Sequence, residues 1–352
     1  MTFQFRDNKT SIRNIYRFAV CAVSFTLLTF CGFLRFSQDF TADNLAKSFL
    51  FSVSASPNDA NEASEQKDIP RFDENIADDT RAPQVQSTEY AHPITALDLS
   101  CEGDRFALRN GETDYSPDLE ALLAAKYPAS LTNAAVSDAP LVLVIHTHAT
   151  ESFCEDGADG YDDETAFRSK DTGKNMVAVG TEFCRTLEAH GIKTLHCTEL
   201  FDDPDYNASY ANSLSAVKGY LKKYPSIKYI FDLHRDAIIR DGGEMIKPVC
   251  RIGDKTAAQI MLVVGTDARG ADHPDWQENL NVAVKLHNGM CERFPGIMRS
   301  IDLRGASFNQ QYGAGFLLVE IGSCGNTLDE AKNAARLLGG GVAEMIGRYG
   351  KQ

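Results

Sequence analysis

The sequence predicts an α/β fold in which a mostly parallel sheet is flanked by helices on both faces. Three observations predict this class. From about Pro140 onward, apolar runs of strand length alternate with longer segments whose apolar residues recur at helical spacing. The first run, Leu141–Ile145, is continuously apolar, which is typical of a strand covered on both faces. Gly191 and Pro225 stand where two of the helical segments should stop.

The expected elements follow one another along the chain. Strands are expected at 141–145, 192–197, 227–233, 258–265 and 316–321. Helices are expected at 175–190, 210–224, 276–294 and 327–345, with a shorter one at 119–126. The last long helix carries Asp329 and Glu330 in its first turn, where the helix dipole favours negative charge.

The first 90 residues differ from the rest. Phe18 to Leu34 contains no charged residue, and a stretch of ~17 apolar residues is at the lower end of what spans a bilayer. Basic residues precede it and acidic residues follow, so residues 1–17 are expected to stay in the cytoplasm while the rest is exported. We therefore expect a transmembrane anchor at 18–35, and a cleaved signal peptide is the alternative.

Between the anchor and the main domain, two further regions are expected. Residues 36–90 are rich in Ala, Ser, Asn, Asp, Glu and Pro, a composition that predicts a disordered linker. Residues 91–137 are expected to be an extension, of uncertain role, that packs on a catalytic domain at 138–352.

Composition excludes some functions. The formal net charge of −14 argues against nucleic acid as a partner, because phosphate binding needs a basic face. The chain has nine cysteines but no CxxC pair, so neither a disulfide framework nor a cysteine-ligated zinc site is indicated.

Histidines follow two of the predicted strands. His146 and His148 come after 141–145, and His234 ends 227–233. The carboxyl ends of neighbouring parallel strands meet at one crevice, where two imidazoles and a carboxylate would suit a catalytic zinc ion. Alternation along a strand places His146 and His148 on one face, so one can bind metal while the other supports it. We prefer His148, which lies farther toward the mouth; a hydrogen-bonded polar rim without metal is the alternative.

Three carboxylates are candidates for the remaining roles. Glu151 and Asp171 both compete to be the third metal ligand, and Asp171 equally suits a helix N-cap. Spacing alone does not separate them. Glu320 interrupts the apolar strand 316–321, where an unpaired carboxylate would be costly, and it is the predicted catalytic base.

Polar residues in the adjoining loops are candidates to contact substrate or to support the metal ligands. Most single residues of this kind only cap helices or face solvent. Those selected here are Arg235, Asp236, Arg304 and Asn309.

Several ordered motifs resemble the stage II sporulation protein P family of exported cell-wall hydrolases. They are HTHATES at 146–152, RSKDTGKN at 168–175, DLHRDAI at 232–238, GTD…HPDWQENL at 265–280, FNQ at 308–310 and LLVEIGSCGNTLDEA at 317–331. The resemblance covers roughly residues 138–348. It implies an amidase-like fold behind one membrane anchor and a variable linker.

The resemblance also implies a function: hydrolysis of peptidoglycan by a zinc-dependent N-acetylmuramoyl-L-alanine amidase. By position, His148 and His234 resemble the family's histidine ligands, and Glu320 resembles its catalytic glutamate. The chain departs from the pattern at the intermediate Glu ligand, where Asp171 stands, so either Asp171 or Glu151 takes that place.

The family is further credited with endopeptidase action and with work beside stage II sporulation proteins D and M in engulfment. The expected protein is thus a single-pass membrane protein with an extracytoplasmic catalytic domain. The rival functions are a non-catalytic wall-binding or scaffolding module, and a zinc peptidase acting on stem peptides only.

Overall fold

The structure is a computed structural model that describes residues 90–101, 107–132 and 138–350. All of them fall within one compact unit, Gln84–Gln352. The predicted segment 1–17, the anchor 18–35 and nearly all of the linker 36–90 lie outside the described residues. Within the described part of the chain, no helix is long and apolar enough to cross a membrane.

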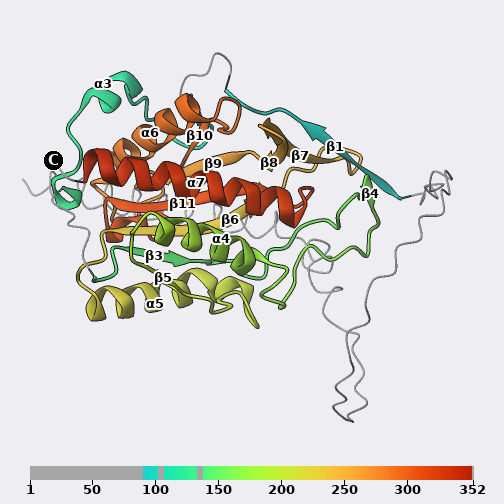
Figure 1. Ribbon diagram of the computed structural model, residues 1–352, viewed down its shortest axis with the longest axis horizontal. Helices are drawn as coiled ribbons and strands as arrows, with labels where there is room; N and C mark the ends of the chain where they lie inside the picture. Colours follow the sequence, from blue (N-terminus) through green and yellow to red (C-terminus); the bar gives the residue numbers. More distant parts are fainter. Residues whose placement is uncertain (1–89, 102–106, 133–137, 351–352) are drawn as a thin grey trace, which may run out of the picture. The chain divides into compact units, whose positions relative to one another are not determined.

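A sheet of seven strands forms the centre of this unit, in the order β2-β10-β9-β11-β6-β3-β5 (Figure 1). The strands are β2 (Leu108–Asn110), β3 (Val142–Ile145), β5 (Thr194–His196), β6 (Tyr229–Asp236), β9 (Ile260–Gly265), β10 (Ile301–Arg304) and β11 (Gly315–Ser323).

The directions of these strands confirm the predicted α/β class with a mostly parallel sheet. Every neighbouring pair is parallel except β9 and β11, which are antiparallel. All five predicted strands are present. The two that were missed, β2 and β10, are only 3 and 4 residues long, too short to give a periodic signal.

Among the residues that the structure describes, five α-helices accompany the sheet. They are α3 (Leu119–Ala124), α4 (Met176–Ala189), α5 (Ser209–Lys223), α6 (Trp276–Arg293) and α7 (Leu328–Tyr349). Local chemistry explains where two of them begin. The Asn175 side chain accepts a hydrogen bond from the Val177 amide at the start of α4. Thr327 and Glu330 form a reciprocal capping box at the start of α7.

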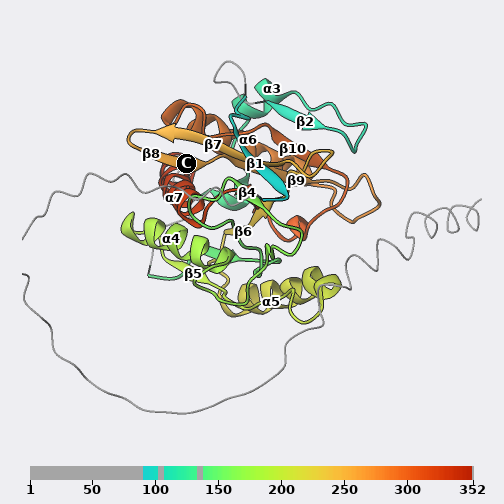
Figure 2. The same cartoon turned by 90° about the vertical axis from the view of Figure 1, so that its right-hand side faces the viewer.

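Helices cover both faces of the sheet, as predicted (Figure 2). On one face, residues of α4, α6 and α7 form the main core; the rings of Phe183 in α4 and Phe231 in β6 meet edge-on at 5.2 Å. Such a pair contributes roughly 0.5–1.5 kcal/mol beyond the burial of its area. On the other face, Val217 of α5 packs on β3 and β6. A separate small cluster of Met261, Val263 and Leu318, with Phe308 against it, lies on β9 and β11.

A second sheet of four strands, in the order β4-β1-β7-β8, was not predicted. Its strands are β1 (His92–Leu97), β4 (Gly160–Tyr161), β7 (Met245–Ile252) and β8 (Lys255–Ala258). The sequence of β7 contains Lys247, Pro248 and Arg251 and lacks the alternation that marks a strand. The segment 91–137, expected only to pack on the domain, contributes β1 to this sheet and β2 to the central one.

Candidate functional site

The central sheet brings His234 and Glu320 side by side. They are register partners on the parallel strands β6 and β11, so their side chains leave the same face of the sheet. Leu318 precedes Glu320 on that face, and Asp232 precedes His234. This is the face that carries α5, and the two functional candidates stand at the carboxyl ends of their strands.

His148 also lies next to His234, but a turn positions it, and not the strand alternation that was predicted. Strand β3 ends at Ile145, and residues 147–150 form a turn, so the alternation of a strand does not extend to His148. The turn places the His148 ring 5.3 Å from the ring of His234, centroid to centroid and nearly perpendicular. The two imidazoles therefore converge.

His146, in contrast, lies away from the cavity, and the expectation that it shares a face with His148 is wrong. Its ring is buried beneath α4, where Nδ1 donates to the Leu233 carbonyl at 3.1 Å and Nε2 lies 2.9 Å from Nε2 of His196. Burial, together with His196, lowers the pKa of His146 to about 3, so it is neutral at physiological pH. His146 therefore has a structural role: it supports the turn 147–150 from the side of the sheet that α4 covers.

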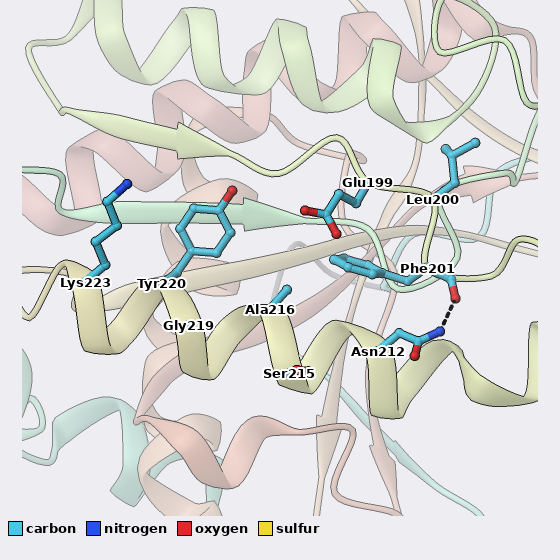
Figure 3. Close-up of a pocket in the computed structure, with 9 residues that line it drawn as sticks. All are labelled: Glu199, Leu200, Phe201, Asn212, Ser215, Ala216, Gly219, Tyr220 and Lys223. Carbon is cyan, nitrogen blue, oxygen red and sulfur yellow. Dashed lines mark hydrogen bonds between the residues drawn. The ribbon is translucent and has the colours of Figure 1, made fainter.

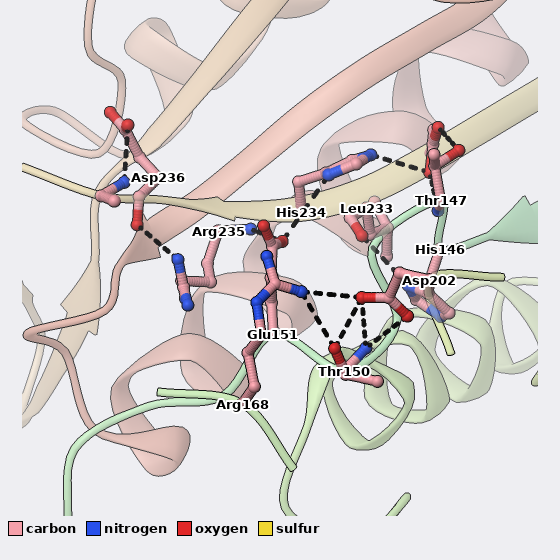
Figure 4. A network of polar contacts seen from close by, with 12 residues as sticks. His146, Thr147, Thr150, Glu151, Arg168, Asp202, Leu233, His234, Arg235 and Asp236 are labelled. Atoms are coloured by element: carbon pink, nitrogen blue, oxygen red, sulfur yellow. Dashed lines mark hydrogen bonds and ion pairs between the residues drawn. The ribbon is translucent and has the colours of Figure 1, made fainter. Parts of the chain in front are cut away.

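Glu151 lies beside His234. Its Oε2 is 3.6 Å from His234 Nδ1 and accepts a hydrogen bond from the Arg235 amide at 3.2 Å (Figure 4). Burial acts to raise the pKa of Glu151, but His234 and Arg235 outweigh it and hold that pKa at about 2. Glu151 is therefore a buried carboxylate that stays ionised.

Asp171, the competing carboxylate, is exposed and absent from the cavity lining. It accepts a hydrogen bond from the Gly173 amide at 2.8 Å, in the loop before α4. The helix cap itself is Asn175. The geometry thus favours Glu151 for the third position.

Asp232 orients His234 from behind. Asp232 Oδ1 lies 3.0 Å from His234 Nε2, and the amide and hydroxyl of Thr147 contact the same carboxylate at 2.8 and 2.6 Å. Burial opposes ionisation, yet His234 and Thr147 lower the pKa of Asp232 to about 2. Asp232 and Glu151 in turn raise the pKa of His234 well above its usual value, against the effect of burial.

Glu320 is a half-buried residue whose carboxyl group has one buried, unpartnered oxygen. Its Oε2 is buried and makes no hydrogen bond to any residue that the structure describes. Burial raises the pKa of Glu320 to about 8, although the charge of His234 opposes this. An orphaned buried oxygen of this kind costs about 1–3 kcal/mol, which indicates a role other than stability.

His148, Glu151, His234 and Glu320 line one cavity of about 310 Å³. Its polar lining comprises His148, Glu151, Arg168, Tyr206, Tyr210, His234, Arg235, Asp236, Arg304 and Glu320. Its apolar lining includes Val263, Leu318 and Phe308, which form a wall beside Glu320.

The predicted loop residues have distinct places. Arg235 donates from Nε to Ser152 O and from Nη2 to Phe167 O, tying the loop that carries Glu151 to β6. Asp236 pairs with Arg299 at 2.9 Å, and Arg304 pairs with Glu112 at 3.0 Å.

Asn309 lies outside the cavity lining. It adopts a left-handed conformation with φ 61°, next to Phe308 with φ 49°. Its side chain donates to Tyr210 O at 3.0 Å, so it fastens the loop that carries Phe308 to α5.

Sequence reasoning missed a stack of three side chains beside the metal-binding candidates. The ring of Tyr206 lies parallel to His148 at 4.4 Å, and the Arg168 guanidinium lies 4.6 Å from the Tyr206 ring centroid. Arg168 Nη1 donates to Asp202 at 2.8 Å and to Thr150 at 3.0 Å (Figure 4). The motif RSKDTGKN, which begins at Arg168, was the available signal for this residue.

The donor types fit a zinc ion. His148 Nδ1 is buried and makes no hydrogen bond to a described residue. Two ligands about 2.0–2.2 Å from a tetrahedral zinc lie roughly 3.3–3.6 Å apart, close to the 3.6 Å between His234 Nδ1 and Glu151 Oε2. As the side chains stand, however, the described residues contain no group of three or more His, Cys, Asp or Glu placed to hold a metal ion.

A larger cavity, of about 620 Å³, lies elsewhere, between α5 and the loop after β5 (Figure 3). Its lining includes Glu199, Phe201, Tyr220 and Lys223, but none of the clustered groups described above. We therefore place the candidate site at the smaller cavity, where the buried ionisable groups converge.

Comparison with known proteins identifies a family whose profile this sequence matches. The profile of the stage II sporulation protein P family matches residues 35–343. Stage II sporulation protein P of Bacillus subtilis (strain 168) is 29% identical over 219 residues, which are 59% of this chain and 51% of that protein. This chain thus spans about half the length of the curated relative it matches.

Solved structures give weaker likenesses. The apo N-acetylmuramyl-L-alanine amidase Ami1 of Mycobacterium abscessus is 13% identical, covering 60% of this chain and 99% of its own, with a TM-score of 0.35. The CwlD amidase of Clostridioides difficile, in complex with the GerS lipoprotein, is 11% identical, covering 59% and 98%, with a TM-score of 0.36. Scores this low do not establish a shared fold. The family match spans most of the sequence, and on that ground the chain belongs to the stage II sporulation protein P family.

Proposed function

We propose that this protein is a peptidoglycan hydrolase, a zinc-dependent N-acetylmuramoyl-L-alanine amidase that acts in sporulation. The observation that carries the proposal is the convergence of His148, Glu151 and His234 on a cavity that the carboxyl group of Glu320 also lines. The family membership supports it, because the resemblance implies this substrate and the two histidine ligands His148 and His234.

In this proposal His148, Glu151 and His234 hold the zinc ion. Asp232, anchored by Thr147, keeps His234 in its orientation and raises its basicity as a ligand. When bound, zinc would polarise the amide carbonyl and lower the pKa of water at the site to about 7.

Glu320 moves the protons. Its carboxylate takes a proton from the attacking water, and the same oxygen then delivers that proton to the nitrogen of the leaving amine. Without metal, burial holds the Glu320 pKa near 8, and a cation in the cavity would lower it toward the range where a base functions at neutral pH. Val263, Leu318 and Phe308 form the apolar part of the cavity lining near this carboxyl group.

The remaining assignments follow the family resemblance and the sequence. We propose a membrane anchor at 18–35 that holds the catalytic domain outside the cytoplasm. We also propose partnership with stage II sporulation proteins D and M in engulfment, and a second activity on peptide cross-links.

The test is Glu320→Gln in the full chain, assayed on purified sacculi. We expect the variant to fold and bind zinc while cleavage falls by about 10²–10⁴-fold, the usual contribution of a general acid–base group. Glu344→Gln is the matched control, because Glu344 forms only exposed ion pairs with Arg293 and Arg348 and should leave activity unchanged.

Mass analysis of the released fragments separates the activities. An amidase frees whole stem peptides from the glycan, whereas a peptidase shortens the stems and leaves L-alanine attached. Full activity of Glu320→Gln, or of metal-chelated wild type, would refute the mechanism. Binding to sacculi without cleavage or bound zinc would instead identify a scaffolding module.

A further inference from the structure

A second cavity, of about 490 Å³, adjoins the candidate site. It lies along the loop 152–169 and the segment before α4, and its lining includes Phe153, Tyr161, Ser169 and Lys174. Arg168 lines both cavities, and so stands at the boundary between them. The volume is within the range of about 300–1,000 Å³ that ligand pockets occupy.

Arg168 is held in place by one side of its guanidinium group. Nη1 donates both of its hydrogens, to Asp202 Oδ2 and to Thr150 Oγ1. The Asp202 side chain is fully buried and also receives the Thr150 amide and hydroxyl, so this anchor is rigid. Tyr206 supports the plane of the guanidinium from one side.

The other edge of the same group is available. Arg168 Nε and Nη2 make no hydrogen bond to any residue in the described ranges, and the side chain is 42% exposed. These two nitrogens form the fork that matches the two oxygens of a carboxylate. A guanidinium that is fixed on one edge and open on the other has the geometry of a carboxylate receptor, preorganised before any ligand arrives.

The charged residues that line the second cavity also favour the binding of a carboxylate. Lys174 lines it and forms no ion pair with a described residue, while Glu155 is the single acidic residue of the lining. Arg304, the other arginine at the candidate site besides Arg235, is already paired with Asp302 and Glu112. Among these arginines, Arg168 is therefore the one whose Nε and Nη2 donors remain available to a ligand.

We propose that Arg168 binds a free carboxylate of the substrate and that the second cavity takes the acidic peptide that extends from the scissile amide. The proposal rests on the proposed function, since it names which part of that substrate the protein recognises. Lys174 adds positive charge farther along the same cavity.

The experiment compares two muramyl peptides of equal length that differ only in whether the second amino acid carries a free carboxyl group or its carboxamide. We expect Arg168→Gln to raise KM for the free acid by about 10- to 100-fold, the range of a lost charge-assisted hydrogen bond, with kcat little changed. The KM for the carboxamide should change much less. Arg168→Lys should recover part of the loss, because it keeps the charge without the fork.

Lys170→Gln is the matched control. Lys170 lies two residues away on the same segment and pairs with Asp203 at 2.7 Å, but it lines neither cavity. If Arg168→Gln fails to fold because Asp202 is left unpaired, Arg168→Gln/Asp202→Asn removes both charges together and makes the same comparison.

Binding to an inactive variant separates this proposal from the proposed function. Calorimetric titration of the two peptides onto Glu320→Gln measures carboxylate recognition without catalysis, and it should show the same preference and the same loss on Arg168→Gln. If the wild type cleaves neither peptide, the proposed function is refuted. The titration would still show whether Arg168 binds the free carboxylate. Equal losses for acid and carboxamide, in kcat rather than KM, would overturn the proposal and leave Arg168 as a support for His148 through Tyr206.

Discussion

Glu320 and His234 are register partners on the adjacent parallel strands β11 and β6. Their separation is therefore set by the backbone ladder, with strands roughly 4.8 Å apart, and not by flexible loops. In the proposed enzyme, one is the proton carrier and the other a metal ligand. Placing both on neighbouring strands keeps the proton carrier within reach of the reacting atoms in every conformation of the loops.

The two competing carboxylates can be separated by zinc affinity. We expect Glu151→Gln to weaken zinc binding by more than about 100-fold, because it removes a ligand rather than a partner of one. Asp171→Asn should bind zinc as the wild type does, because Asp171 is exposed and bonded within its own loop. Competition with a chromogenic chelator measures both; a normal affinity in Glu151→Gln would contradict the proposed ligand set.

Asp232 should matter for the metal without touching it. Asp232→Asn keeps the volume and the contacts with Thr147 but loses the charge that holds His234. Loss of such a partner usually costs 10–100-fold in metal affinity. We expect a decrease of about that size in the same competition assay. Glu244→Gln is the control, since Glu244 pairs with Arg240 and is absent from the lining of the candidate site.

Gly180 provides a test of the support beneath His148. A Cβ at Gly180 would lie 2.5 Å from His146 Nε2 and 2.7 Å from His196 Nε2. We expect Gly180→Ala to destabilise the protein by about 1–3 kcal/mol through overpacking and to lower activity by displacing the turn that carries His148. Urea unfolding and the sacculus assay measure the two effects.

Gly219→Ala is the matched control for this change. Gly219 lies within α5, and a Cβ there would meet nothing within 4 Å. Alanine should stabilise that helix by roughly 0.5–1 kcal/mol. If both variants behaved alike, the close packing of α4 on His146 would not be the cause.

The raised pKa of Glu320 should make stability depend on pH in the metal-chelated protein. Its pKa is about 8 in the folded state, against 4.5 for the ordinary group. The folded state therefore holds the proton more tightly, and this contribution to stability is full below about pH 4.5 and lost as the pH rises toward 8. Each pKa unit is worth about 1.4 kcal/mol, so the loss amounts to a few kcal/mol.

Glu320→Gln has no such titration. We expect its free energy of unfolding to exceed that of the wild type at pH 8 and the difference to shrink toward pH 5, as measured by urea unfolding with chelator present. A constant difference across this range would show that Glu320 is not held protonated by burial.

The sequence by itself determined the class of fold and most of the residues of the candidate site. Apolar runs and amphipathic segments predicted the strands β3, β5, β6, β9 and β11 and the helices between them, because burial on both faces leaves a strong pattern. His148, His234 and Glu320 were identifiable because each is a polar residue at or beyond the end of an apolar strand, a position seldom occupied without a reason.

Tertiary structure alone decided the rest. The choice of Glu151 over Asp171 depends on how the loop 152–168 folds back, and no spacing rule encodes that path. His146 was misplaced because β3 ends one residue before it, so the alternation of a strand could not be extended to His148. The short strands β2 and β10, the sheet built on β7, and the stack of Arg168 on Tyr206 arise from contacts between segments far apart in the chain. Local patterns carry no record of such contacts.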